Sequence, residues 1–208
     1  MINSIIVSDS NDEILGQFYE KCKLKSEQIL KQSKKGIKTN IIPSNAAFDI
    51  VLPMQLPNIN EDRFIFISYT HGSKTELLQS GSIPFISSSD NENQLKNAFA
   101  YCFACEAGNT LGKELCKNGT LAFIGYNTNV TIQIYFGALD SFIECATSGL
   151  AALVSGMSFK DVYLSMKEKY NDCIDEFYKK DLLTASLFMD NRDALVLHGN
   201  GGLTIDDL

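Results

Sequence analysis

Only two histidines, His71 and His198, stand beside six cysteines in the chain, so an imidazole–thiol pair can be sought residue by residue. His71 directly follows one apolar run and precedes Gly72, and Cys105 directly follows a second apolar run. A thiolate is a strong nucleophile, and a neighbouring imidazole both favours it and carries protons. Cys105 is therefore the candidate nucleophile, and His71 is the candidate base.

The main chain beside this pair could hold an anion. Gly72 has no side chain to block a substrate carbonyl, so its N–H and that of Cys105 are candidate oxyanion donors. A helix expected shortly after Cys105 would add the positive end of its dipole near the thiol.

Cys102 and Cys105 also have the C-x-x-C spacing of redox and metal sites. A redox pair should open a helix together, whereas Cys102 falls inside the apolar run and is expected to be a packed core thiol. Zinc held by these two residues with Cys116 and His71 would lack a second ligand pair at metal-site spacing. We therefore expect neither a metal nor an organic cofactor. Cys22, Cys145 and Cys173 are expected on apolar helix faces.

The elements that must position these residues alternate along the chain. Strands are expected at 4–7, 39–42, 64–69, 98–104 and 121–126, with further strands at 48–52, 130–136, 182–189 and 194–198. Helices are expected from about 14 to 36, at 111–117, at 138–154 and at 159–179. Ser10 with Glu13, and Ser158 with Asp161, are spaced as capping boxes. Runs 182–189 and 194–198 are expected to pair around the turn 190–193.

This alternation predicts an α/β fold, a three-layer sandwich with a mostly parallel central sheet, because parallel neighbours are usually joined by a crossover helix. Ligands bind such sheets beyond the carboxyl ends of the strands, where His71 and Cys105 are expected. With 208 residues, 45% of them apolar, residues 1–208 are expected to form a single domain.

Charge and hydropathy exclude several classes of function. Eighteen basic and twenty-five acidic residues give a net charge of −7 without a basic block, which excludes nucleic acid as a partner. No apolar run approaches the roughly 20 residues that span a bilayer, and the N-terminus lacks the pattern of a secretory signal. We therefore expect no membrane partner and a cytoplasmic protein with reduced thiols.

Residues 64–72 and 104–108 together resemble the caspase-like cysteine peptidases, the group of caspases, gingipains, separases and CHAT-type bacterial peptidases. One apolar strand ends in His71-Gly72, and another ends in Ala104-Cys105 with Gly108 three residues later. Residues 119–126 look like the strand after the nucleophile in gingipain-type members, and 195–200 are similar to a closing strand of CHAT-type members.

The resemblance implies a caspase-like fold, with Cys105 attacking a peptide carbonyl and His71 moving the proton. The amides of Gly72 and Cys105 would hold the oxyanion, and an acyl-enzyme would form on a protein or peptide substrate. The caspase signature is absent, since Phe103 precedes Ala104, and the interval from His71 to Cys105 is shorter than the roughly 50 residues of caspases. Because the chain has no room for a recognition domain, a regulatory protein partner is a further expectation.

In this group, a pocket holds the substrate side chain that precedes the scissile bond. The pocket lies near the end of the first strand and near the strand after the nucleophile. Asp9, Asp12 and Asn127 lie at those positions. An acidic pocket would favour Lys or Arg in the substrate. The alternative is that both aspartates are solvated acids of a loop and a helix start, and Asp12 already fits inside the first capping box.

Two other interpretations of the sequence stay open. The run 64–69 also resembles the first-strand box of TIR domains, which bind or cleave nicotinamide dinucleotides, although two elements precede it and a catalytic glutamate has no clear counterpart. The third reading is a non-catalytic interaction module with the caspase-like fold. The joint presence of His71-Gly72 and Cys105 argues against a scaffold, which needs neither at a strand end.

Overall fold

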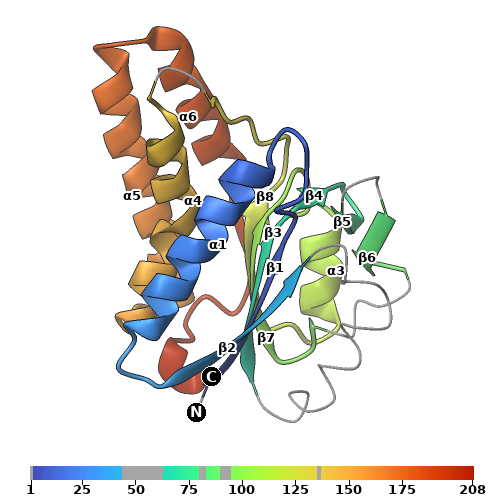
Figure 1. Ribbon diagram of the computed structural model, residues 1–208. Coiled ribbons are helices and arrows are strands. Elements are labelled where there is room, and N and C mark those ends of the chain that lie inside the picture. Colours follow the sequence, from blue (N-terminus) through green and yellow to red (C-terminus); the bar gives the residue numbers. More distant parts are fainter. Residues whose placement is uncertain (1, 44–62, 80–82, 90–94, 135–136) are drawn as a thin grey trace.

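A single six-stranded sheet forms the centre of the computed structural model, which describes residues 2–43, 63–79, 83–89, 95–134 and 137–208 (Figure 1). The strand order is β2-β1-β3-β7-β8-β9. The strands are β1 (Ile2–Ser8), β2 (Ile37–Pro43), β3 (Phe64–Tyr69), β7 (Ala98–Phe103), β8 (Ala122–Tyr126) and β9 (Leu195–Gly199). The first five are parallel, and β9 runs antiparallel to β8, which confirms the mostly parallel sheet.

Both faces of this sheet are covered, so its inner strands are buried along their whole length. All residues of β3 and β7 are buried, as expected when a parallel sheet lies between two layers. One layer holds α1 (Gly16–Lys31), α4 (Leu139–Val154), α5 (Phe159–Tyr178) and α6 (Leu182–Ala194) (Figure 1). The other holds α3 (Leu111–Lys117) and a small antiparallel sheet of β4 (His71–Gly72), β5 (Glu76–Gln79) and β6 (Ile83–Ser87). A 3₁₀ turn, Ile205–Asp207, follows β9.

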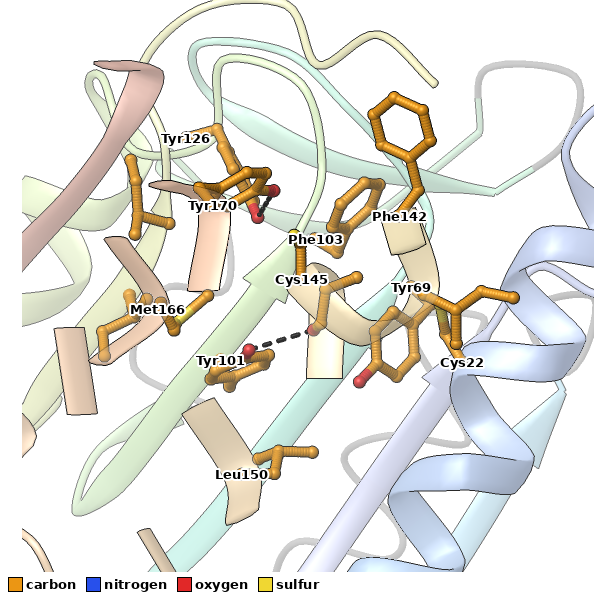
Figure 2. Packing of buried hydrophobic residues seen from close by; sticks show 14 of the residues in the cluster. Cys22, Tyr69, Tyr101, Phe103, Tyr126, Phe142, Cys145, Leu150, Met166 and Tyr170 are labelled. Carbon is orange, nitrogen blue, oxygen red and sulfur yellow. Dashed lines mark hydrogen bonds between the residues drawn. The ribbon is translucent and has the colours of Figure 1, made fainter. Parts of the chain in front are cut away.

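The larger core lies between the sheet and the four-helix layer, and it is rich in tyrosine (Figure 2). The Tyr126 and Tyr170 hydroxyls are hydrogen-bonded at 2.9 Å, and the Tyr101 hydroxyl donates to the Ala146 carbonyl at 2.9 Å. Because these three buried hydroxyls have partners, their rings fill the core without the cost of an unpaired polar group.

The predicted strand pair at 182–189 and 194–198 is half wrong. Residues 182–194 form α6, and only the second run is a strand. The Asp181 carboxylate accepts from the Leu183 N–H and caps the helix. Thr184, Phe188 and Asn191 are buried at intervals of four and three, so the run follows the period of a helix rather than that of a strand.

Three further expectations either differ from the structure or concern residues outside the described ranges. Residues 130–134 of the predicted strand 130–136 have no strand partner, and 135–136, like the strand expected at 48–52, lie outside the described residues. The Ser10–Glu13 box is also wrong, because the Asp12 carboxylate accepts from the Ile14 and Leu15 N–H groups ahead of α1. Ser158, in contrast, is the N-cap of α5, as predicted. No helix in the described ranges is long and apolar enough to cross a membrane.

Candidate active site

The register of two neighbouring strands brings His71 and Cys105 to the same place in the sheet. Tyr69 on β3 is paired with Phe103 on β7, and each candidate residue lies two positions beyond its strand's last pair. The pairing continues past the strand ends, since the Thr70 N–H donates to the Phe103 carbonyl at 3.3 Å. Both residues therefore lie beyond the carboxyl ends of the adjacent strands β3 and β7, at the edge where sheets of this kind bind ligands.

The imidazole of His71 is held by Asp12, with 2.8 Å between Nε2 and Oδ2. The ring of Tyr19, on α1, stands edge-on to it with 5.9 Å between centroids. A carboxylate only accepts hydrogen bonds, so Nε2 carries the hydrogen, and the Nδ1 lone pair of the neutral ring is left for proton transfer.

Asp12 remains ionised in this setting. Burial raises the pKa of its carboxyl, but hydrogen bonds from the Leu15 N–H, His71 and the Ile14 N–H outweigh that effect and hold the pKa below 3.8. Burial also raises the pKa of Tyr19, and negative charge at Cys105 and Asp12 raises it further. The Tyr19 hydroxyl therefore stays neutral, and it lies close enough to interact electrostatically with the Asp12 carboxylate and the Cys105 thiol.

Asp9 completes the acidic side of the site. It is fully buried, and ligand atoms of Asp9, Asp12 and His71 all lie within 4.8 Å of one another. Such a set could hold a cation in principle. The Asp12 carboxylate and the His71 imidazole are already joined by a hydrogen bond. We therefore interpret the three residues as an acid–imidazole pair with Asp9 as a second acid nearby. The structure thus brings two of the three predicted pocket residues to the imidazole.

The thiol of Cys105 is half-buried and lies against the main chain of Val130. The Val130 N–H donates to Sγ at 3.4 Å, and the thiol is 3.8 Å from the Val130 carbonyl. Among the described residues no hydrogen bond joins Sγ to the imidazole, although the two groups are neighbours in register. Glu106, immediately after the thiol, has φ +55° and donates its N–H to the Thr128 carbonyl at 3.0 Å. A residue other than glycine has a strained backbone in this left-handed conformation, and such strain is found at functional sites.

The segment 127–134, which contacts the thiol, is fastened by α6. The Asn191 side chain is fully buried and pairs with the Thr131 main chain on both sides, with Oδ1 accepting at 3.0 Å and Nδ2 donating at 2.7 Å. The Asn127 N–H donates to the Ala194 carbonyl at 2.8 Å, so this predicted pocket residue is half-buried beside α6. Neither Asn191 nor Val130 was predicted from the sequence to lie near the thiol, and Asn191 was expected in a turn.

Gly72 packs directly on the backbone of Cys105. An ideal Cβ at this position would lie 2.6 Å from the Cys105 carbonyl oxygen, so only glycine permits the approach. The Ser73 N–H bonds to the Glu76 carbonyl, and the alternation of an antiparallel ladder then makes Gly72 a non-hydrogen-bonded position against β5. Its N–H is directed away from β5, as an oxyanion donor requires.

The expected contribution of a helix dipole is not supported. Helix α3 begins at Leu111, beyond a series of turns that separates it from Cys105. The N–H groups of Thr110 and Leu111 both donate to the Lys74 carbonyl. The start of α3 therefore holds the β4–β5 connection instead of facing the thiol.

The other thiols and the second histidine have structural surroundings. Cys102 and Cys22 are buried, and burial raises the pKa of each thiol well above its ordinary value. Burial also raises the pKa of Cys116, to about 11. His198 donates from Nε2 to the Gly108 carbonyl at 2.6 Å and stacks on Phe123. Cys102 is thus a core thiol, as predicted.

Comparisons with known proteins locate the fold. The sequence matches no protein-family model and no curated protein. Among solved structures, the Arg-specific cysteine proteinase gingipain R is similar to 99% of this chain, with a TM-score of 0.62 and 16% identity. An inactive zymogen of a C11 protease from Parabacteroides distasonis is similar to 62% of it, with a TM-score of 0.44 and 12% identity.

The likeness to gingipain R shows that the chain has the caspase-like α/β fold expected from the sequence. This chain covers 48% of the gingipain R chain, so it spans about half the length of that protein. At 16% identity the likeness concerns the fold, and the chemistry must be argued from the residues at the ends of β3 and β7.

Proposed function

We propose that this protein is a cysteine endopeptidase with Cys105 as nucleophile, His71 as general base and acid, and Asp12 as the residue that orients His71. The observation that carries the proposal is the shared register of His71 and Cys105 beyond Tyr69 and Phe103, together with the Asp12 hydrogen bond on the far imidazole nitrogen. A nucleophile beside a base that is itself oriented by a third group is the arrangement of covalent catalysis.

The reaction follows from the roles of these groups. Nδ1 of His71 takes the thiol proton, and Sγ of Cys105 attacks the peptide carbonyl carbon. The N–H groups of Gly72 and Cys105 stabilise the oxyanion that develops. His71 then gives its proton to the departing amine, which leaves an acyl-enzyme, and water activated by His71 releases the acid and the thiol.

The substrate is proposed to be a protein or peptide that lies across the carboxyl ends of the strands. Asp9 and Asp12 place negative charge beside His71, and Asn127 lies near the end of β8. If these residues also reach the side chain before the scissile bond, that side chain is Lys or Arg. Screening a peptide library tests this point, and cleavage only after acidic or apolar residues would exclude it.

The decisive experiment treats the purified protein with a peptide-based electrophile and locates the adduct by mass spectrometry. We expect one adduct, on Cys105, and loss of labelling in Cys105→Ala. Cys102→Ser is the matched control, because Cys102 lies three residues before Cys105, on β7, and is buried. His71→Ala should slow labelling and abolish hydrolysis.

Other outcomes separate the alternatives. Labelling of Cys102 in preference to Cys105 would contradict the assignment. Hydrolysis of a nicotinamide dinucleotide by the unlabelled protein would favour the TIR-like reading. Labelling of Cys105 without turnover of any peptide would fit an enzyme that needs a regulatory partner, and adding cell extract to the labelled and unlabelled protein would test that dependence.

A further inference from the structure

Two cysteines outside the candidate active site form a close pair between helices. Cys145 on α4 and Cys173 on α5 are both free thiols, and their Sγ atoms are 3.5 Å apart. Cys145 is fully buried among the aromatic residues of the larger core (Figure 2). Cys173 is 4% exposed. No other two thiols in the described ranges are hydrogen-bonded to each other.

The two thiols are not equivalent. The S–H of Cys145 points to the sulfur of Cys173 and also lies 3.9 Å from the Lys169 carbonyl. This hydrogen bond lowers the pKa of Cys173 against the effect of burial, and the Lys169 ammonium lowers it further. Burial raises the pKa of Cys145. Cys173, which is also the one with exposed surface, is the thiol better able to react as a thiolate.

We propose that Cys145 and Cys173 form an oxidisable dithiol, a modification site for small hydroperoxides that closes into a disulfide between α4 and α5. The Cys173 thiolate attacks the terminal peroxide oxygen, the O–O bond breaks, and an alcohol or water leaves as Cys173 becomes a sulfenic acid. The Cys145 sulfur then attacks the sulfenic sulfur and loses its proton, and the hydroxyl group leaves as water. One peroxide is reduced and two thiols are oxidised.

The geometry allows this closure with a small movement. A disulfide has its sulfur atoms about 2.05 Å apart, so the pair must approach by roughly 1.5 Å. The two helices are consecutive and share a close interface, and the four residues 155–158 join them. Closing the loop between the cysteines also restricts the unfolded chain, so the oxidised protein should be more resistant to heat than the reduced protein.

The test uses hydrogen peroxide on folded Cys105→Ser protein, so that the half-buried active-site thiol does not compete. The protein is digested without reductant and analysed by mass spectrometry. We expect a peptide pair joined through Cys145 and Cys173, formed at least about tenfold faster than oxidation of Cys22, a buried thiol without a thiol neighbour. The unfolding temperature should rise by several degrees and fall again with dithiothreitol.

Two serine variants resolve the order of the steps. In Cys145→Ser the sulfenic acid on Cys173 should persist and be trapped by dimedone, whereas Cys173→Ser should leave Cys145 reduced. If either variant does not fold, the relative rates of Cys173 and Cys22 in the parent protein decide the matter. Equal rates, oxidation of Cys173 to a sulfinic acid without a bridge, or a bridge that forms only in denaturant would overturn the proposal.

Discussion

The imidazole of His71 has two nitrogens, and Asp12 binds one of them, which decides what the other does. Nε2 faces the carboxylate at 2.8 Å, so the neutral ring presents its lone pair at Nδ1. The other oxygen of the same aspartate accepts from the N–H groups of Ile14 and Leu15 in the turn before α1. One side chain thus holds both the turn before α1 and the tautomer of His71.

Asp12→Asn should lower kcat by about a hundredfold or more, because an amide can donate to Nε2 and drive the hydrogen onto Nδ1. The amide oxygen of asparagine can still accept from the Ile14 and Leu15 N–H groups, so the turn before α1 should be retained. The measurement is peptide hydrolysis with the circular dichroism of the variant as a check on folding. An unchanged kcat with a raised KM for Lys and Arg substrates would show instead that Asp12 is a pocket residue.

Acid should weaken the folded protein through the same carboxylate. The folded pKa of Asp12 lies below its ordinary value of 3.8, so its contribution to the free energy of unfolding is complete above 3.8 and is lost as the pH falls through the folded pKa. The urea midpoints of wild type and Asp12→Asn should therefore differ at about pH 5 and converge towards about pH 2. A difference that does not change over this range would contradict the assignment.

At the residue scale, the strand pattern allowed the positions of His71, Gly72 and Cys105 after buried strands to be predicted. His71, Gly72 and Cys105 stand out because each follows a buried run, and buried runs are visible in composition alone. The pairing of Asp12 with His71 was not predicted. It depends on the turn before α1 folding back over the end of β3, and nothing local in residues 9–15 specifies that path.

At the scale of elements, the site depends on β3 and β7 lying in register and on α6 fastening the segment beside the thiol. The strands were predictable, since each is apolar throughout. Helix α6 was mistaken for a strand because its run of leucine, phenylalanine and methionine has no polar face to reveal its period. With α6 misread, the contact of Asn191 with Thr131 could not be anticipated.

Asn191→Ala should lower kcat/KM about tenfold and the free energy of unfolding by about 1 kcal/mol, because both Thr131 main-chain groups lose their partner and Val130 is no longer held against Cys105. Asp190→Ala is the matched control, an exposed neighbour on the same helix. Hydrolysis and urea unfolding are measured on both. If stability falls and hydrolysis does not, the segment does not position the thiol.

The whole molecule is held by two cores, one on each face of the sheet. The larger one fastens α6 through Phe188, which is fully buried and stacked on Phe142 with 4.0 Å between ring centroids. The layered architecture was predictable, because alternating strands and helices leave few other arrangements. The small sheet of β4, β5 and β6 was not predicted, since its strands are short and Pro84 interrupts the pattern.

Phe188→Ala should reduce the free energy of unfolding by about 3–5 kcal/mol, as expected for a large ring removed from a close-packed core. Leu183→Ala, on the same helix but 67% exposed, should change it by less than about 0.5 kcal/mol. Chemical denaturation measures both. A loss below about 1 kcal/mol for Phe188→Ala would mean that α6 is not anchored at this ring.

The attachment of Val130 by Asn191 has a consequence for synthesis. A ribosome delivers Asp12, His71 and Cys105 long before it delivers the Asn191 amide that holds the main chain at Thr131, because Asn191 comes 86 residues after Cys105 in the sequence. When Cys105 has been synthesised, the main chain at Val130 and Thr131 is therefore not yet held in place. Hydrolysis should begin only after translation has passed α6.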